Sequence, residues 1–178
     1  ASGLAEVARE SRLVVEAVVE DLETKRRVFR SLGEGSQPDV ILATNTSSIS
    51  IDALAAAVSA ERRTRYVGMH FFSPVPVMPL VEVVPWMGTN PTVLEGTRML
   101  VEAWRKAVVV AADTPGFIVN RVARPFYGEA WRAYTEGAAD PATIDAIVRD
   151  CGGFPMGPFE LMDLIGNDIN FAATESLY

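Results

Sequence analysis

Short apolar runs alternate with helical segments along the first two thirds of the chain. The apolar runs, each typical of a strand, occupy residues 12–17, 40–43, 66–71, 80–86 and 107–111. Between them, helical periodicity is present at residues 22–32, 51–58 and 91–105, and Ser50 is placed to cap the second of these helices. Because the apolar runs do not alternate strictly with polar residues, we expect a mostly parallel sheet covered on both faces, with strand 12–17 buried.

The pattern becomes wholly helical after Asp113. We expect one helix from Phe117 to Gly137, bent near Pro125, and further helices at residues 141–151, 158–165 and beyond. The predicted fold class is therefore α/β. Residues 1–113 form the C-terminal part of a Rossmann-like, doubly wound sheet, and residues 114–178 form an all-helical domain, with the boundary at residues 114–116.

Both ends of the chain read as the interior of a helix. Residues 1–10 resemble the tail of a helix without its beginning, and the last five residues stop within a helical pattern. We therefore expect the chain to be a fragment of a longer protein.

Composition narrows the possible partners and location. The net charge of −7 disfavours nucleic acid and anionic membrane surfaces as partners. Apolar runs fall short of the roughly 20 residues that a membrane-spanning helix requires. Cys151 is the one cysteine, so an internal disulfide framework is excluded and a cytoplasmic location is expected.

The single histidine, His70, ends an apolar run, and Glu82 interrupts the next one twelve residues later. Histidine is suited to take and return a proton near neutral pH, and a carboxylate within an apolar strand requires a cationic or hydrogen-bonding partner. Three prolines lie between the two residues and favour a fixed path back toward the start. A His–Glu dyad is one hypothesis; a structural histidine and a glutamate on a solvent-facing edge strand form the alternative. A metal site is not expected, because one histidine and one cysteine supply too few ligands for zinc.

Other polar residues follow predicted strands, at the edge where α/β sheets bind ligands. Residues 45–48 (Asn-Thr-Ser-Ser) follow the second strand and could hold a substrate oxygen or a cofactor amide, or simply lead into a helix. Glu20 and Lys25 begin the helix after the first strand. The residues alone are equally consistent with a carboxylate favoured near a helix N-terminus and a solvated lysine. We expect Lys25 to share the polar face of that helix with Arg26 and Arg27, opposite its apolar face at residues 28–29.

Two further features bear on a cofactor site. Asn120 lies among apolar neighbours near the start of the long helix, so an inward-facing carboxamide would require a partner, although most helical asparagines bond locally or face solvent. The Gly33-Glu34-Gly35 segment lacks a third glycine and ends a helix, so it is not a dinucleotide-binding turn.

Taken together, these segments resemble the L-3-hydroxyacyl-CoA dehydrogenases, including their 3-hydroxybutyryl-CoA dehydrogenase branch. The matching stretches occur in family order and cover nearly the whole chain: residues 13–22, 45–48, 70–82, 113–121 and 153–161. The His-Phe-Phe block at residues 70–72 and the Pro-Gly-Phe-Ile-Val-Asn-Arg block at residues 115–121 are highly specific as a pair.

The resemblance implies NAD-dependent oxidation of a short- or medium-chain 3-hydroxyacyl-CoA. His70 would be the general base for the 3-hydroxyl proton, Glu82 would orient its imidazole, and Ser47 and Asn120 would position the substrate oxygen and cofactor. The remaining implied NAD contacts are Glu20, Lys25, Asn45 and Ser73. The last is a departure, because much of the family carries Asn where this chain has Ser73.

The resemblance also implies a homodimer formed through the helical domain. The family's glycine-rich turn precedes the first residue of this chain, so we expect these residues alone to bind NAD weakly and to be inactive. The alternatives are a related hydroxyacid dehydrogenase without CoA, a module of a multifunctional fatty-acid oxidation protein, and a protein that has kept the fold but lost turnover.

Overall fold

The computed structural model describes residues 2–175 and 177. The chain divides into two compact units, Ala1–Phe117 and Ile118–Tyr178. The first unit carries the strands, and the described part of the second is helical.

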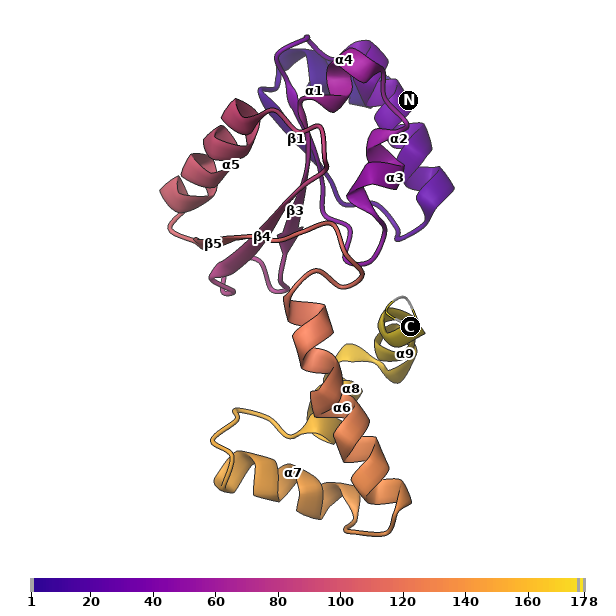
Figure 1. Ribbon diagram of the computed structural model, residues 1–178, viewed down its shortest axis with the longest axis vertical. Coiled ribbons are helices and arrows are strands. Elements are labelled where there is room, and N and C mark those ends of the chain that lie inside the picture. Colours follow the sequence, from indigo (N-terminus) through magenta and orange to yellow (C-terminus); the bar gives the residue numbers. More distant parts are fainter. Residues whose placement is uncertain (1, 176, 178) are drawn as a thin grey trace. The chain divides into compact units, whose positions relative to one another are not determined.

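The first unit is built on a five-stranded sheet in the order β1-β2-β3-β4-β5 (Figure 1). Its strands are β1 (Leu13–Glu16), β2 (Ile41–Thr44), β3 (Tyr66–Phe71), β4 (Leu80–Pro85) and β5 (Ala107–Val110). The pairs β1–β2, β2–β3 and β4–β5 are parallel, whereas β3 and β4 are antiparallel. The predicted mostly parallel sheet is thus confirmed, with one reversal of direction.

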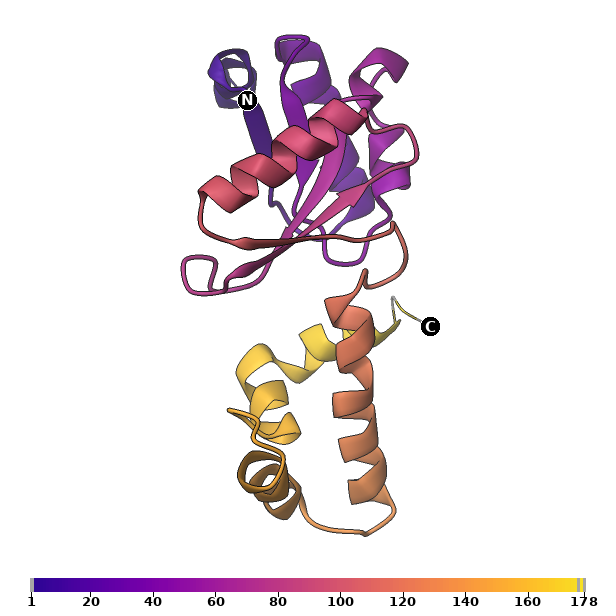
Figure 2. The same cartoon turned by 60° about the vertical axis from the view of Figure 1, so that its left-hand side comes forward.

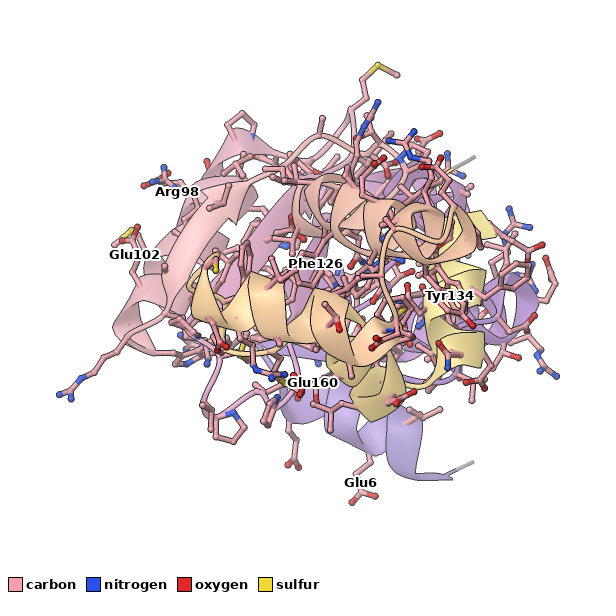
Figure 3. All side chains as sticks on the ribbon, turned by 90° about the horizontal axis from the view of Figure 1, so that it is seen from below. Glu6, Arg98, Glu102, Phe126, Tyr134 and Glu160 are labelled. Carbon is pink, nitrogen blue, oxygen red and sulfur yellow. The ribbon has the colours of Figure 1, made fainter. Side chains whose placement is uncertain are left out.

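Helices cover both faces of this sheet (Figures 1 and 2). On one face, α1 (Ser2–Glu10), α2 (Leu22–Gly35) and α3 (Ile51–Ala55) contribute to a core that includes Phe29, Leu32 and Leu54. On the other face, α5 (Pro91–Ala103) places Val101 against Ala43, Val67, Met69, Val81 and Val83. The opposite face of α5 is polar, and Arg98, labelled in Figure 3, forms ion pairs there with Glu95 and Glu102.

Two expectations for this unit are wrong in detail. Strand β1 is not buried: it lies at the sheet edge, Val15 is 36% exposed, and only Glu16 of its residues is buried. The helix expected over residues 51–58 starts under the predicted Ser50 cap but ends at Ala55. A separate short helix, α4 (Ala60–Arg63), follows it under a cap from Ser59.

Lys25 does not share the polar face of α2 with Arg26 and Arg27. Its side chain is 1% exposed and lies on the buried side of α2 with Phe29 and Leu32. The spacing explains the placement, because residues four and seven positions apart occupy one face of a helix. The expectation failed because it grouped Lys25 with its neighbours by charge and not by helical position.

The second unit contains α6 (Val119–Thr135), α7 (Pro141–Asp150), α8 (Pro158–Ile165) and α9 (Asn167–Glu175). Helix α8 has its predicted bounds and is held at its first turn by Asp145, which accepts from the backbone N–H groups of Phe159 and Glu160 at 2.9 and 3.0 Å. Helix α6 begins two residues later than predicted. Gly116 and Phe117 have φ angles of 71° and 47°, in the left-handed region that a right-handed helix does not use.

Within residues 2–175 and 177, no helix is both long enough and apolar enough to cross a membrane.

Candidate active site

Glu82 and His70 are cross-strand partners on β4 and β3. The antiparallel register pairs them directly, and Glu82 Oε2 lies 2.7 Å from His70 Nδ1. Both side chains are buried, with Glu82 0% and His70 4% exposed. A carboxylate can only accept, so we assign the proton to Nδ1 and the lone pair to Nε2.

Ser47 is the partner of the other ring nitrogen. Its Oγ lies 3.0 Å from His70 Nε2, so with the assigned tautomer the hydroxyl donates to the ring. Asn45, two residues earlier, accepts through its Oδ1 from the backbone N–H of Phe71 at 2.8 Å. Asn45 therefore fixes the loop that follows β2 against the end of the histidine-bearing strand.

Glu20 holds the same loop from the end of β1. Its Oε1 accepts from the Thr46 hydroxyl at 2.5 Å, from the Ser47 N–H at 2.9 Å, and from the N–H and hydroxyl of Ser48, each at 3.1 Å. Partial burial raises the pKa of the Glu20 carboxyl. These hydrogen bonds and the charge of Lys25 lower the pKa, and together they outweigh the effect of burial. The net result is a pKa below the ordinary value, and Glu20 is an ionised brace for the loop that carries Ser47.

Lys25 connects Glu20 to a second carboxylate, that of the buried Glu16, which the sequence reasoning missed. Its Nζ lies 2.7 Å from Glu16 and 3.3 Å from Glu20, and it donates to the Val18 carbonyl at 3.1 Å. Glu16 is itself 4% exposed and also accepts from the Thr44 hydroxyl at 2.8 Å. These contacts account for the three donors of the ammonium group. A lysine at buried helical spacing, nine residues after a carboxylate that ends a strand, is the sequence signal for this pair.

Two aromatic rings flank the imidazole of His70. The Phe72 ring centroid lies 4.6 Å from the imidazole centroid in a tilted arrangement, and that of Phe117 lies 5.6 Å away in an edge-to-face arrangement. Sequence reasoning assigned neither ring to the site.

The structure brings together six of the predicted residues in the first unit: Glu20, Lys25, Asn45, Ser47, His70 and Glu82. Ser73 is exposed at the start of the β3–β4 connection. Asn120 belongs to the second unit, in the first turn of α6. Its backbone carbonyl accepts a hydrogen bond from Arg124 Nε at 3.1 Å. The catalytic and cofactor-binding roles of all the predicted residues remain predictions.

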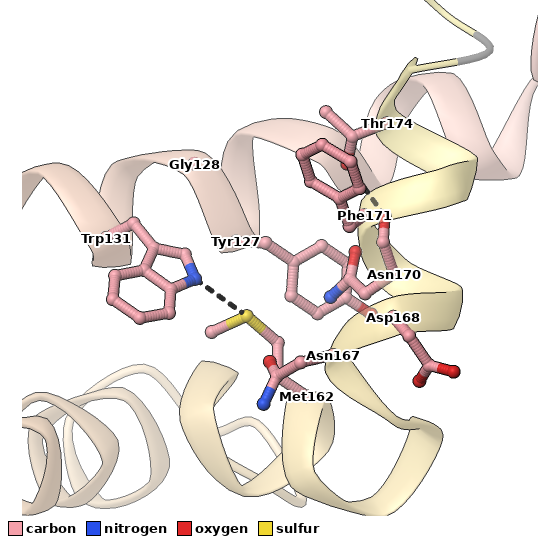
Figure 4. Close-up of a pocket in the computed structure, with 9 residues that line it drawn as sticks. All are labelled: Tyr127, Gly128, Trp131, Met162, Asn167, Asp168, Asn170, Phe171 and Thr174. Atoms are coloured by element: carbon pink, nitrogen blue, oxygen red, sulfur yellow. Dashed lines mark hydrogen bonds between the residues drawn. The ribbon is translucent and has the colours of Figure 1, made fainter.

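The second unit has a pocket of its own, of about 540 Å³ (Figure 4). Its lining residues come from α6, α8 and α9: Tyr127, Gly128, Trp131, Met162, Asn167, Asp168, Asn170, Phe171 and Thr174. The Trp131 indole donates to the Met162 sulfur at 3.2 Å on one wall. None of the predicted catalytic or cofactor residues lines this pocket.

A mostly parallel sheet covered by helices on both faces, with polar residues at the carboxyl ends of its strands, is typical of the α/β proteins that bind dinucleotides. Residues 1–114 match the 3-hydroxyacyl-CoA dehydrogenase NAD binding domain, and residues 116–178 match the 3-hydroxyacyl-CoA dehydrogenase C-terminal domain. The chain belongs to the 3-hydroxyacyl-CoA dehydrogenase family.

Individual relatives agree. The chain is 54% identical over 166 residues to the 3-hydroxyadipyl-CoA dehydrogenase of Escherichia coli, covering 93% of this chain and 34% of that protein. It is 43% identical to the mitochondrial hydroxyacyl-coenzyme A dehydrogenase of Homo sapiens, covering 92% of this chain and 52% of that protein. The crystal structure of (S)-3-hydroxybutyryl-CoA dehydrogenase from Ralstonia eutropha matches with a TM-score of 0.93 at 37% identity, covering 99% of this chain and 61% of that one. The chain thus spans between about a third and three-fifths of the length of these relatives.

Proposed function

We propose that the complete protein oxidises (S)-3-hydroxyacyl-CoA to 3-oxoacyl-CoA with NAD as hydride acceptor, on short- or medium-chain substrates such as 3-hydroxybutyryl-CoA. The observation that carries this proposal is the continuous hydrogen-bonded line Ser47–His70–Glu82 at the ligand edge of the sheet. The names of the relatives support the substrate class.

The proposed chemistry follows from the two faces of the imidazole. In the structure, the lone pair of His70 Nε2 accepts from the Ser47 hydroxyl at 3.0 Å, and we propose that a substrate hydroxyl takes the place of this donor and transfers its proton to Nε2. Loss of hydride from C3 leaves positive charge on the carbon unless the hydroxyl proton departs as well. His70 takes that proton, and Glu82 stabilises the resulting imidazolium through Nδ1–H. In the reverse direction His70 returns the proton to the carbonyl oxygen.

The residues present fit one part of an NAD site. The loop at residues 45–48 follows β2 at the edge where such cofactors bind, and Glu20, braced against it, is 39% exposed in its side chain. We propose that Glu20, Asn45, Ser47 and Ser73 line the nicotinamide end. Lys25 would act through Glu20, since its ammonium is buried between carboxylates. When bound, NAD supplies the hydride acceptor.

The 178 residues contain no glycine-rich strand-to-helix turn of the kind that binds the pyrophosphate of a dinucleotide. Calorimetric titration of this chain with NAD should therefore show no tight binding. Low-micromolar affinity would show that the residues present suffice and would overturn this expectation.

A substrate comparison tests the proposed class. The complete protein should oxidise NADH with acetoacetyl-CoA and not with free acetoacetate. Preference for the free acid would favour a hydroxyacid dehydrogenase without CoA. In the oxidative direction, 3-hydroxybutyryl-CoA and 3-hydroxyadipyl-CoA should be compared, because the relative in Escherichia coli is named for the latter. The comparison decides which of these two acyl-CoA substrates, both within the proposed class, the protein prefers.

We propose further that the complete protein is a cytoplasmic homodimer joined through its helical domain. Support comes from exposed apolar side chains on α6, α8 and α9, among them Val122 (72%), Leu164 (70%) and Phe171 (63%). Light scattering of the complete protein should give twice the chain mass; a monodisperse monomer would exclude the dimer. The cytoplasmic assignment rests on cysteine usage alone, and fractionation of the source cells tests it.

A further inference from the structure

We propose that Phe117 is a positioning residue for the His70 imidazole, held against it by the carboxylate of Asp113. This inference rests on the proposed role of His70 as general base. It assigns a function to the segment that joins the two units, a segment that the proposed mechanism does not use.

Four side chains of the first unit contact the His70 imidazole. Glu82 and Ser47 hold the two nitrogens, and the rings of Phe72 and Phe117 lie against the imidazole ring. The ring can turn about its Cβ–Cγ bond, and the hydrogen bonds at its two nitrogens define the orientation that it prefers. Aromatic contacts at the ring face and edge restrict this rotation. Phe117 is 4% exposed, so its own ring has little room to move away.

The backbone of Phe117 is held in an uncommon conformation. Its φ of 47° lies in the left-handed region, which few residues other than glycine adopt and which aromatic side chains rarely do. A turn precedes it, with Pro115 and left-handed Gly116 at the centre and a hydrogen bond from Phe117 N–H to the Thr114 carbonyl at 2.9 Å. Uncommon backbone conformations persist where the surroundings enforce them, and they concentrate at functional sites.

We infer that Asp113 holds the turn that contains Phe117 in place. Its carboxylate accepts from Ser50 Oγ, Ile51 N–H and Asp52 N–H, each at 2.9 Å. These donors form the N-terminus of α3, which directly follows the loop that carries Ser47. A single carboxylate therefore fixes the start of the Phe117 turn to the start of α3, next to the loop that carries Ser47, and a shift of either segment would alter how the imidazole is held.

Phe117 also belongs to the apolar core of its unit, so a purely structural role must be separated from positioning. Phe29→Leu is the matched control: Phe29 is in the same core, is fully buried, and packs edge-to-face on Tyr66 at 4.7 Å, away from the imidazole. Both leucine variants lose an aromatic ring from one core. Only Phe117→Leu loses a contact with His70.

The test uses the complete enzyme, with its His70 imidazole signals assigned by their loss in His70→Gln. In the wild type, the ring protons of Phe117 should show nuclear Overhauser contacts with the His70 ring. In Phe117→Leu, the His70 signals should shift or broaden and kcat should fall about tenfold at unchanged KM for NADH, as expected for a misplaced catalytic group. Phe29→Leu should leave kcat of the folded enzyme unchanged. Asp113→Asn should also lower kcat, because it weakens the contacts that hold the Phe117 turn.

Absence of the wild-type Phe117–His70 contact would overturn the proposal even if the variants failed to fold. Unchanged kcat in folded Phe117→Leu would also overturn it, as would an equal loss in Phe29→Leu. Turnover that survives in His70→Gln would instead contradict the proposed function, while the ring contact and the order of the imidazole would still be measurable.

Discussion

His70 and Glu82 meet across the antiparallel pairing of β3 and β4, with Nδ1 and Oε2 2.7 Å apart. The other pairings in the described sheet are parallel and join strands separated by longer connections. The reversal lets a short, proline-containing loop bring two residues twelve positions apart into direct register. The exception to the parallel pattern therefore creates the proposed proton relay.

Replacing Glu82 by Gln should lower kcat by about 10²-fold or more, because the amide preserves the shape but cannot stabilise an imidazolium. KM for NADH should change little, since Glu82 contacts the histidine and not the proposed cofactor loop. Steady-state kinetics on the complete protein measures both constants. Glu95→Gln, an exposed change on α5, is the control. A loss no greater than that of the control would reduce Glu82 to a packing residue.

Lys25→Met should destabilise the fold by about 3–5 kcal/mol, because it leaves the Glu16 carboxylate buried without its cation. Urea unfolding followed by circular dichroism measures the effect. On the same helix, the exposed change Arg27→Met should cost no more than about 0.5 kcal/mol.

Adding Glu16→Gln to Lys25→Met should recover much of the lost stability, since the buried charge is then removed. If Lys25→Met were as mild as Arg27→Met, the pair would be better solvated than its burial indicates.

Glu20 should make stability depend on pH in the acidic range. Its pKa in the folded state lies below the ordinary value of 4.5, so folding favours the ionised form. The resulting stabilisation is complete above that ordinary pKa and is lost as the pH falls through the lower pKa of the folded state. The urea midpoints of wild type and Glu20→Gln should therefore differ more at pH 7 than in acid. A difference independent of pH would contradict the proposed ionised brace.

Local patterns in the sequence predicted the sheet, and they offered the His70–Glu82 dyad as one of two interpretations. Strand β3 has its predicted bounds. Glu82 stands alone in an apolar run, and this pattern indicated that its carboxylate requires a polar partner. The loop prolines indicated a return path, and the antiparallel register provides one.

Three features were missed, each for a different reason. The burial of Lys25 was visible in its spacing from Phe29, but its charge suggested solvent. Helix α6 starts late because the backbone at Phe117 is left-handed. The residue type gives no sign of this, since phenylalanine rarely adopts that conformation. Asp113 reaches the start of α3 from about sixty residues away in the sequence, a pairing that only the folded chain reveals.

The most direct test of the account is NADH oxidation with acetoacetyl-CoA by the complete protein, measured beside His70→Gln. The account predicts turnover in the wild type and a fall in kcat of about 10²-fold or more in the variant, the loss expected when a general acid is removed. A folded, NADH-binding wild type without turnover, or a His70→Gln variant with nearly full activity, would contradict it.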